Sequence, residues 1–196
     1  MTDKNHIELL TKTSDYIYLE YSRFKLVCLI MFKKFNLKNI EEKAVYDFIS
    51  YLADRSLIDS FLLHYKVLMD FLIRNRYEIN EEGLMPFDKP THVYACDFLS
   101  VEKSELYFKS VTYKKYKDLS LDNRRKSHLH LGDLTIYHDV KQEDWDFSQL
   151  TQQVAKLSLH FYKYLDFKSL PEEVHSLLFE IQKESKGLIK ITSKNK

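Results

Sequence analysis

The stretch 122–131 holds the densest group of side chains that could do chemistry: two arginines, a lysine and two histidines within seven residues. Four residues separate Arg125 from His130, and five separate Arg124 from His130. An arginine can bind a scissile phosphate and stabilise its growing negative charge. A histidine titrates near neutral pH, so it can act as general acid or base. With an RNA 2′-hydroxyl as nucleophile, such a pair needs neither a metal ion nor a cofactor, and we interpret the stretch as a candidate site for cutting RNA.

Other side chains could support this site. Lys126 and His128 lie within the same stretch and could add contacts to the substrate. Lys66 and Asp70 lie far away in the sequence and would join the site only if their helix faced the stretch. As residues four apart on one helix, they are more simply interpreted as a local salt bridge.

Further groups have both a structural and a functional interpretation. His64 is in phase with apolar residues of its predicted helix, so we expect it to form a hydrogen bond within the core rather than to act in catalysis. The segment 107–117 interleaves tyrosines with lysines, a pattern that could stack on and grip single-stranded RNA. An amphipathic helix whose lysine stems lie along apolar surface explains the same pattern, and we favour it. The sequence indicates no partner for His160 or His175.

Two other interpretations of the stretch 122–131 stay open. Charged residues at this spacing occur easily by chance on the solvated side of a short helix. Histidines and carboxylates also bind zinc, manganese or iron, and a metal cluster could use the following residues: His128, His130, Asp133, His138 and Asp139. The Gly-Asp and His-Asp pairs resemble those of metallophosphoesterases, but that family needs apolar strands and glycine-rich loops, and this chain has only 3 Gly. We therefore expect no metal site.

Composition indicates the fold class that must position these residues. A chain of 196 residues can bury a substantial core and fits one domain, which we expect to span residues 1–196. Only 3 Gly and 3 Pro are present, too few for the many turns of a sheet protein, so the sequence predicts an all-α helical bundle. With 14 Tyr and 13 Phe there is enough aromatic mass for a helical core.

Hydrophobic periodicity places the helices of the first half. The first is predicted over 14–35, with Ser14 as N-cap and a turn or short helix before it. Two more are predicted over 40–53 and 57–75, or as one bent helix, and the second should lie at the centre of the core. Residues 77–98 lose all periodicity, and a loop of this length is usually functional or disordered. Its last part, 93–98, is apolar enough to pack on the helices.

The second half begins with a helix predicted over 101–117. A short helix over 121–131, with Gly132 as C-cap, and a brief extended piece over 134–137 should follow. Asp146 is then predicted to cap a helix with an apolar stripe made of Leu150, Val154, Leu157, Phe161 and Leu165. The last helix is predicted over 170–186, with Ser169 as its cap and Gly187 as its end.

Four stretches follow one another in a recognisable order: SFLLHYKVLMDF over 60–71, VYACDF over 93–98, HL over 130–131, and WDF over 145–147 before a final helix. This layout resembles the HEPN class of helical bundles (the higher-eukaryote and prokaryote nucleotide-binding domains). The resemblance covers residues 40–165.

The resemblance implies a bundle of four or more helices that often dimerises. Active members of the class are metal-independent ribonucleases that use an arginine and a histidine separated by four to six residues, and many belong to toxin–antitoxin or phage-defence systems. The matching residues here are Arg125 or Arg124 with His130. Two positions depart from the pattern: Lys66 stands where the central helix has arginine, which keeps the charge but loses the planar fork, and Asn123 precedes the arginines instead of following them.

The net charge, the cysteines and the apolar runs indicate what to expect of nucleic-acid binding, thiol chemistry and cellular location. A net charge of +1 argues against a strongly basic nucleic-acid-binding domain but allows a local basic site. Cys28 and Cys96 lack the spacing of metal or redox motifs, so we expect free, buried thiols. No signal peptide is recognisable and the most apolar run, 27–32, is too short to cross a bilayer, so we expect a cytoplasmic protein without a membrane partner.

The expected function is a metal-independent endoribonuclease or RNA-binding protein of a toxin–antitoxin or defence system. One arginine–histidine pair per subunit supplies few catalytic groups. We therefore expect the active form to be a homodimer that brings two such motifs together. The expected partners are RNA, a second copy of the chain and a cognate antitoxin or other protein. The alternative is a non-catalytic interaction or scaffold module that keeps the fold without the chemistry.

Overall fold

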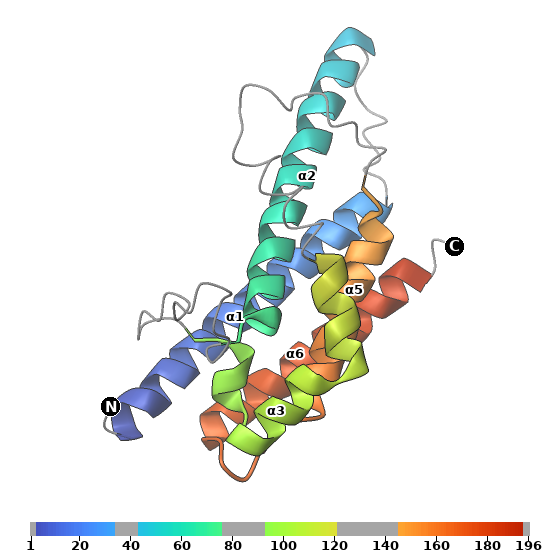
Figure 1. Cartoon of the computed structure of the whole chain (residues 1–196). Coiled ribbons are helices and arrows are strands. Elements are labelled where there is room, and N and C mark those ends of the chain that lie inside the picture. The colour runs from blue at the N-terminus through green and yellow to red at the C-terminus, as the bar shows by residue number, and fades with distance from the viewer. Residues whose placement is uncertain (1–2, 34–42, 76–92, 121–144, 194–196) are drawn as a thin grey trace, which may run out of the picture.

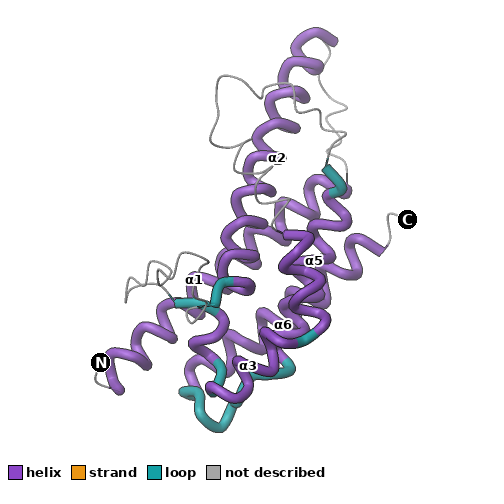
Figure 2. The backbone as a smooth tube through the Cα atoms, viewed as in Figure 1, coloured by secondary structure: helices purple, strands orange, loops and turns teal. Residues whose placement is uncertain are grey.

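The computed structural model describes residues 3–33, 43–75, 93–120 and 145–193, whose regular structure is entirely helical (Figure 1, Figure 2). No strand occurs within these ranges, so the predicted all-α class is confirmed. Residues 77–92, the first part of the loop predicted over 77–98, lie outside the described residues. So do the segments predicted as a short helix over 121–131 and as an extended piece over 134–137.

The first helix, α1, spans Asp3–Lys33 and begins well before the predicted start. Ser14 is buried inside it, and its hydroxyl donates a hydrogen bond to the carbonyl of Leu10 at 2.8 Å. The predicted N-cap at Ser14 is therefore wrong. A serine that bonds back to the carbonyl four residues earlier can remain in a helix interior, and buried Leu10 shows that the apolar stripe begins one turn earlier.

The second helix, α2, spans Lys43–Ile73 without interruption. The division into two helices at residues 53–57 is wrong, and the single-helix alternative holds. No glycine or proline lies between residues 43 and 73, so no residue there removes a backbone hydrogen bond or weakens the helix strongly. The predicted central position is confirmed by four fully buried side chains: Phe61, Tyr65, Leu68 and Leu72.

Helix α5 spans Phe147–Tyr162 and begins where the sequence predicts. The carboxylate of Asp146 accepts a hydrogen bond from the backbone N–H of Gln149 at 2.8 Å, as an N-cap does. All five residues of the predicted stripe are buried. The short 3₁₀ helix η1, Ala95–Phe98, also packs inward as predicted, with Ala95, Cys96 and Phe98 buried.

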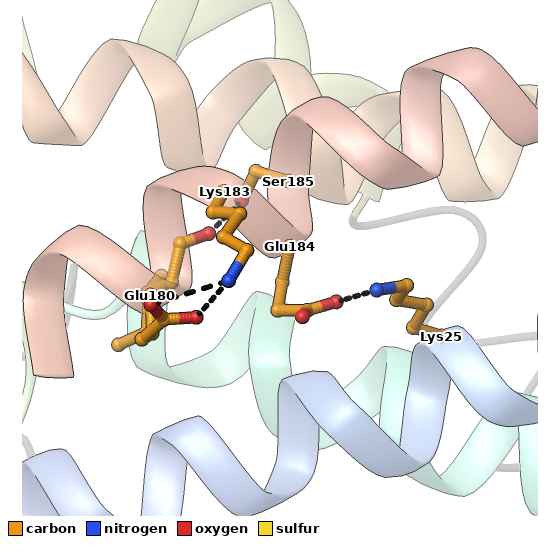
Figure 3. A network of polar contacts seen from close by, with 6 residues as sticks. Lys25, Glu180, Lys183, Glu184 and Ser185 are labelled. Carbon is orange, nitrogen blue, oxygen red and sulfur yellow. Dashed lines mark hydrogen bonds and ion pairs between the residues drawn. The ribbon is translucent and has the colours of Figure 1, made fainter.

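Helix α6 spans Glu172–Ser193 and continues through Gly187, so the predicted end at this glycine is wrong. Interior glycine costs a helix about 1 kcal/mol relative to alanine, and packing beyond the glycine offsets this. Leu188 is fully buried, and the ammonium of Lys25 on α1 lies 2.5 Å from the carboxylate of Glu184 (Figure 3). A Cβ atom at position 187 would lie 3.6 Å from Cε of Lys25, an ordinary van der Waals distance.

The four long helices form a closed ring in which α1 packs on α2 and α6, and α5 packs on the same two (Figure 1). Aromatic pairs mark the contacts: Phe24 of α1 lies against Phe61 of α2, with ring centroids 4.9 Å apart. Along the α2–α5 contact, Phe61 meets Phe147 and Phe71 meets Phe161, so these two helices run in the same direction.

Polar side chains also join helices through the core. The hydroxyls of Tyr21 on α1 and Ser158 on α5 form a hydrogen bond. Tyr65 of α2 donates to the amide oxygen of Gln153 of α5 at 2.8 Å. Because buried polar groups need partners, these pairs specify how the helices are placed relative to each other.

The segment predicted as one helix over 101–117 is two helices. Helix α3 spans Val101–Lys109, and a second helix covers 111–120. Ser110 between them has extended backbone (φ −66°, ψ 146°), and its hydroxyl accepts a hydrogen bond from the N–H of Tyr113 at 3.1 Å. The serine therefore ends α3 and caps the next helix. A hydroxyl that bonds locally to the backbone competes with a continuous helix, which explains the break.

The tyrosines of this segment close the end of α2. Tyr107 donates a hydrogen bond to the carbonyl of Leu72 at 3.0 Å, and Tyr113 donates to the carbonyl of Ile73 at 2.7 Å. The last carbonyls of a helix lack partners within it, so these hydroxyls satisfy groups that α2 leaves open. Both tyrosines are buried, which rules them out as stacking platforms for RNA bases.

Candidate functional site

The residues that the sequence favours for catalysis, Arg124, Arg125 and His130, lie outside the described residues, as do the supporting Lys126 and His128. The possible metal cluster over 128–139 also falls there.

Lys66 and Asp70, the other supporting residues, lie half-buried on α2. The carboxylate of Asp70 lies 3.6 Å from the guanidinium of Arg74, one turn further along the helix. Helical geometry places Lys66 about 160° from His64 around the axis of α2. Lys66 therefore faces a different side of α2 from His64, the histidine of the site described next, and cannot belong to that site.

A different arginine and histidine meet where α1 packs on α2. The carboxylate of Glu20 lies 2.6 Å from Nδ1 of His64 and 2.9 Å from a guanidinium nitrogen of Arg23. The side chain of Glu20 is 4% exposed, that of His64 12% and that of Arg23 58%. These three residues are hereafter called the Glu20 cluster. The exposure of their side chains increases from Glu20, which is buried, through His64 to Arg23, whose guanidinium lies in solvent.

The contact with Glu20 decides where the imidazole of His64 can carry a proton. An ionised carboxylate only accepts hydrogen bonds, so Nδ1 must be the donor. In a neutral imidazole Nε2 then keeps its lone pair, and it forms no hydrogen bond with any described residue. A buried acid that holds a histidine in one tautomer leaves the other nitrogen free to take up a proton.

Tyr16 lies one turn before Glu20 on α1 and is half exposed. Burial raises the pKa of its hydroxyl, the negative charge of Glu20 raises it further, and the positive charge of Arg23 opposes this. Tyr16 is thus within electrostatic reach of the Glu20 cluster and remains a neutral phenol at neutral pH.

Several exposed apolar side chains lie on α1 and α2 beside the Glu20 cluster. Leu19 and Leu26 share one stripe of α1 with Tyr16 and Arg23, because residues three, seven and ten positions apart lie on one helix face. Leu19 is 49% exposed, Leu26 58%, and Leu63 on the outer side of α2 51%. Exposed apolar side chains grouped on one face are typical of surfaces that contact other molecules.

Sequence reasoning found only part of this site. The predicted hydrogen bond of His64 exists, but its acceptor is a glutamate 44 residues earlier, which no local pattern indicates. The pair Glu20 and Arg23, three residues apart on one helix, was the only local signal. Such pairs are common on solvated helix faces, so only the burial of Glu20 makes this one informative.

Two further histidines have partners that the sequence did not indicate. His160 of α5 lies with Nε2 2.7 Å from the hydroxyl of Ser110. On α6, His175 lies with Nε2 2.9 Å from the carbonyl of Leu170.

Other classes of site find little support in the described ranges. No three histidine, cysteine, aspartate or glutamate side chains come close enough there to hold a metal ion. Cys28 and Cys96 are buried thiols that form no disulfide with each other, as predicted. Among the described helices, none combines the length and apolar character that crossing a bilayer requires. Comparison of the chain with family models, curated proteins and solved structures found no match.

Proposed function

We propose that the chain binds RNA and cleaves it without a metal ion, using a histidine as proton acceptor and an arginine as phosphate ligand. The observation that carries the proposal is the Glu20 cluster, in which one buried carboxylate contacts both an imidazole and a guanidinium. The stretch with Arg124, Arg125 and His130 contains the same two residue types and is the alternative location of the catalytic site.

At the Glu20 cluster the chemistry divides among three side chains. Nε2 of His64 takes the proton of the RNA 2′-hydroxyl as that oxygen attacks the adjacent phosphorus. The bond from phosphorus to the 5′-oxygen then breaks, leaving a 2′,3′-cyclic phosphate, and the 5′-oxygen takes its proton from the imidazolium or from water. Arg23, with one nitrogen engaged by Glu20, uses its remaining donors on the phosphate oxygens, whose charge grows in the transition state. Glu20 does not touch the substrate; it is a positioning residue that holds the imidazole and stabilises the imidazolium.

The test is cleavage of RNA in the presence of a chelator. His64→Gln should slow cleavage at least about 100-fold, the usual contribution of a general base. Arg23→Lys should also slow it, because a lysine keeps the charge without the planar fork. His175→Gln removes a histidine on another helix and is the matched control.

Parallel variants His130→Gln and Arg125→Gln decide between the two arginine–histidine sets. If only these two variants abolish cleavage, the site lies in the stretch 122–131, and the Glu20 cluster has only the structural role of joining α1 to α2. If the wild-type chain leaves RNA intact, or if neither set of variants changes the rate, the ribonuclease proposal fails.

The resemblance to HEPN bundles supports a place for this activity in a toxin–antitoxin or defence system, acting as a homodimer. Growth inhibition on expression, relieved by His64→Gln or His130→Gln, is the corresponding cellular readout.

A second candidate function, a non-catalytic interaction module, is favoured by the apolar side chains around the Glu20 cluster. A tyrosine and an arginine, residue types enriched at interface centres, lie here beside leucines that are about half exposed. Sedimentation of the wild-type chain and of Leu19→Glu tests it. A dimer that Leu19→Glu dissociates, in a chain that does not cut RNA, would establish this alternative in place of the first.

A further inference from the structure

A second site, separate from the Glu20 cluster, lies where α3 ends and the helix over 111–120 begins. Here the hydroxyl of Ser110 and Nε2 of His160 are 2.7 Å apart, although His160 comes 50 positions later in the sequence. The imidazole packs against two tyrosine rings, with its centroid 5.7 Å from that of Tyr107 and 5.1 Å from that of Tyr164. Both residues are partly buried, so neither is closed off from solvent.

Three properties of the pair match those of an activated serine. His160 is in position to receive the proton of the Ser110 hydroxyl. Burial lowers the pKa of His160, and the charge of Lys163 lowers it further, so the imidazole is neutral at physiological pH and can accept a proton. The N–H of Tyr113 already donates to the serine oxygen, which stabilises negative charge on it.

The start of the helix over 111–120 supplies donors for an oxyanion. The first N–H groups of a helix have no intrahelical acceptor. In the described part of the chain, the N–H of Tyr113 bonds to the Ser110 hydroxyl and that of Lys114 to the Ser110 carbonyl, whereas those of Val111 and Thr112 have no acceptor. Val111 is 84% exposed, so this turn is open to an incoming carbonyl group.

We propose that Ser110 is a nucleophilic serine, with His160 as its general base, that takes up an acyl group from an activated carboxylic ester. As the serine oxygen attacks the carbonyl carbon, its proton passes to Nε2 of His160. The tetrahedral oxyanion is bound by the N–H groups of Val111 and Thr112. The ester bond then breaks, and the leaving alcohol takes the proton from the imidazolium.

We expect this site to turn over slowly, because no acidic side chain of the described residues orients the imidazole of His160. Among the described residues, no carboxylate contacts Nδ1 of His160. Loss of the orienting acid costs serine hydrolases about 10⁴-fold in rate. Both acylation and release should therefore be slow by the standard of these enzymes. Acylation by an activated ester, whose leaving group departs readily, should be faster than release of the acyl group, so one acylation per chain precedes slow turnover.

Ser110 also caps a helix, and a cap alone would explain its contacts with the backbone. The hydroxyl lies 2.7 Å from the carbonyl of Tyr107 as well as 2.7 Å from His160, and its single proton can serve only one of them. If Nε2 of His160 carries a proton, the serine donates to Tyr107 and is only a cap. An acyl-transfer experiment distinguishes these two states.

The chain contains its own control, Ser100. This serine caps α3 in the same way, accepting a hydrogen bond from the N–H of Lys103 at 3.4 Å, is more exposed than Ser110, and has no histidine contact in the described ranges. Reactivity due to exposure or capping alone would therefore favour Ser100, whereas reactivity due to a general base would favour Ser110.

The experiment treats the full chain with p-nitrophenyl acetate and with a fluorophosphonate, and maps the modified serine by mass spectrometry. We expect a burst of one nitrophenolate per chain and labelling of Ser110 at least about 100-fold faster than Ser100, the contribution of a general base. His160→Gln should abolish that difference. Ser110→Asn, which keeps an N-cap side chain, should abolish the burst while the helical circular dichroism is retained.

Equal labelling of the two serines, no labelling at all, or a His160→Gln variant that reacts like the wild type would each overturn the proposal. If Ser110→Asn fails to fold, the ratio of Ser110 to Ser100 labelling in the wild-type chain still decides it.

Discussion

The hydroxyl of Tyr107 lies 3.0 Å from the backbone carbonyl of Leu72, so a residue of α3 satisfies a polar group at the end of α2. Tyr107→Phe should lower the free energy of unfolding by about 1–2 kcal/mol, because a buried carbonyl loses its donor while the ring volume is kept. Chemical denaturation measures this loss. Tyr116→Phe, which changes a partly exposed ring on the next helix, is the control and should leave stability nearly unchanged. An equal effect of the two variants would contradict the capping role of Tyr107.

Gly187→Ala should stabilise the protein by about 0.5–1 kcal/mol, since alanine has the higher helix propensity and restricts the unfolded chain more. The added methyl group would meet only the flexible end of Lys25, at an ordinary distance. Thermal unfolding followed by circular dichroism would show the higher midpoint. A lower midpoint would mean that α6 and Lys25 pack too closely for a methyl group.

The thiol of Cys28 should be unreactive in the folded protein. Burial raises its pKa to about 12 from the ordinary 9.0, although a hydrogen bond with Thr151 opposes the rise. At pH 8 this leaves about a thousand-fold fewer thiolates, the reactive species. Alkylation of Cys96→Ser, which retains Cys28, should be slow in buffer and fast in denaturant. Rapid alkylation in buffer would contradict the burial of this thiol.

Protonation of His160 should destabilise the fold. Burial and the charge of Lys163 lower its pKa in the folded protein below the ordinary 6.5, so the unfolded chain binds the proton more readily. Stability is then complete above about pH 6.5 and falls as the pH drops below that value towards the folded pKa. The free energy of unfolding, measured from pH 7.5 to 5.5, should decrease less in His160→Gln than in the wild type. A slope in His160→Gln equal to that of the wild type would contradict this prediction.

Local signals in the sequence were sufficient for several elements. Asp146 with Gln149 predicted the start of α5, and the spacing of Leu150, Val154 and Leu157 predicted its buried stripe. The low content of glycine and proline predicted the all-α class. Each of these signals acts within a few residues, because capping and amphipathic periodicity are properties of one helix and its first turns.

The same kind of signal failed where packing outweighed it. Ser14 has the side chain of an N-cap but lies inside α1, and Gly187 lies inside α6. A cap or a glycine changes helix stability by about 1 kcal/mol. Burial of a single large apolar side chain contributes about 1.5–3 kcal/mol, so continuous apolar stripes extended these helices past the local stop signals.

The sequence by itself determined the all-α class, the start of α5 and the buried stripes of α2 and α5. Only the tertiary structure decided which polar groups meet: Glu20 with His64, Tyr107 with the carbonyl of Leu72, and Ser110 with His160. These pairs join different helices. No periodicity within one helix specifies the partner of a side chain on another, because that choice depends on how the helices cross and rotate when the whole core packs. The two candidate sites of this protein are products of that packing.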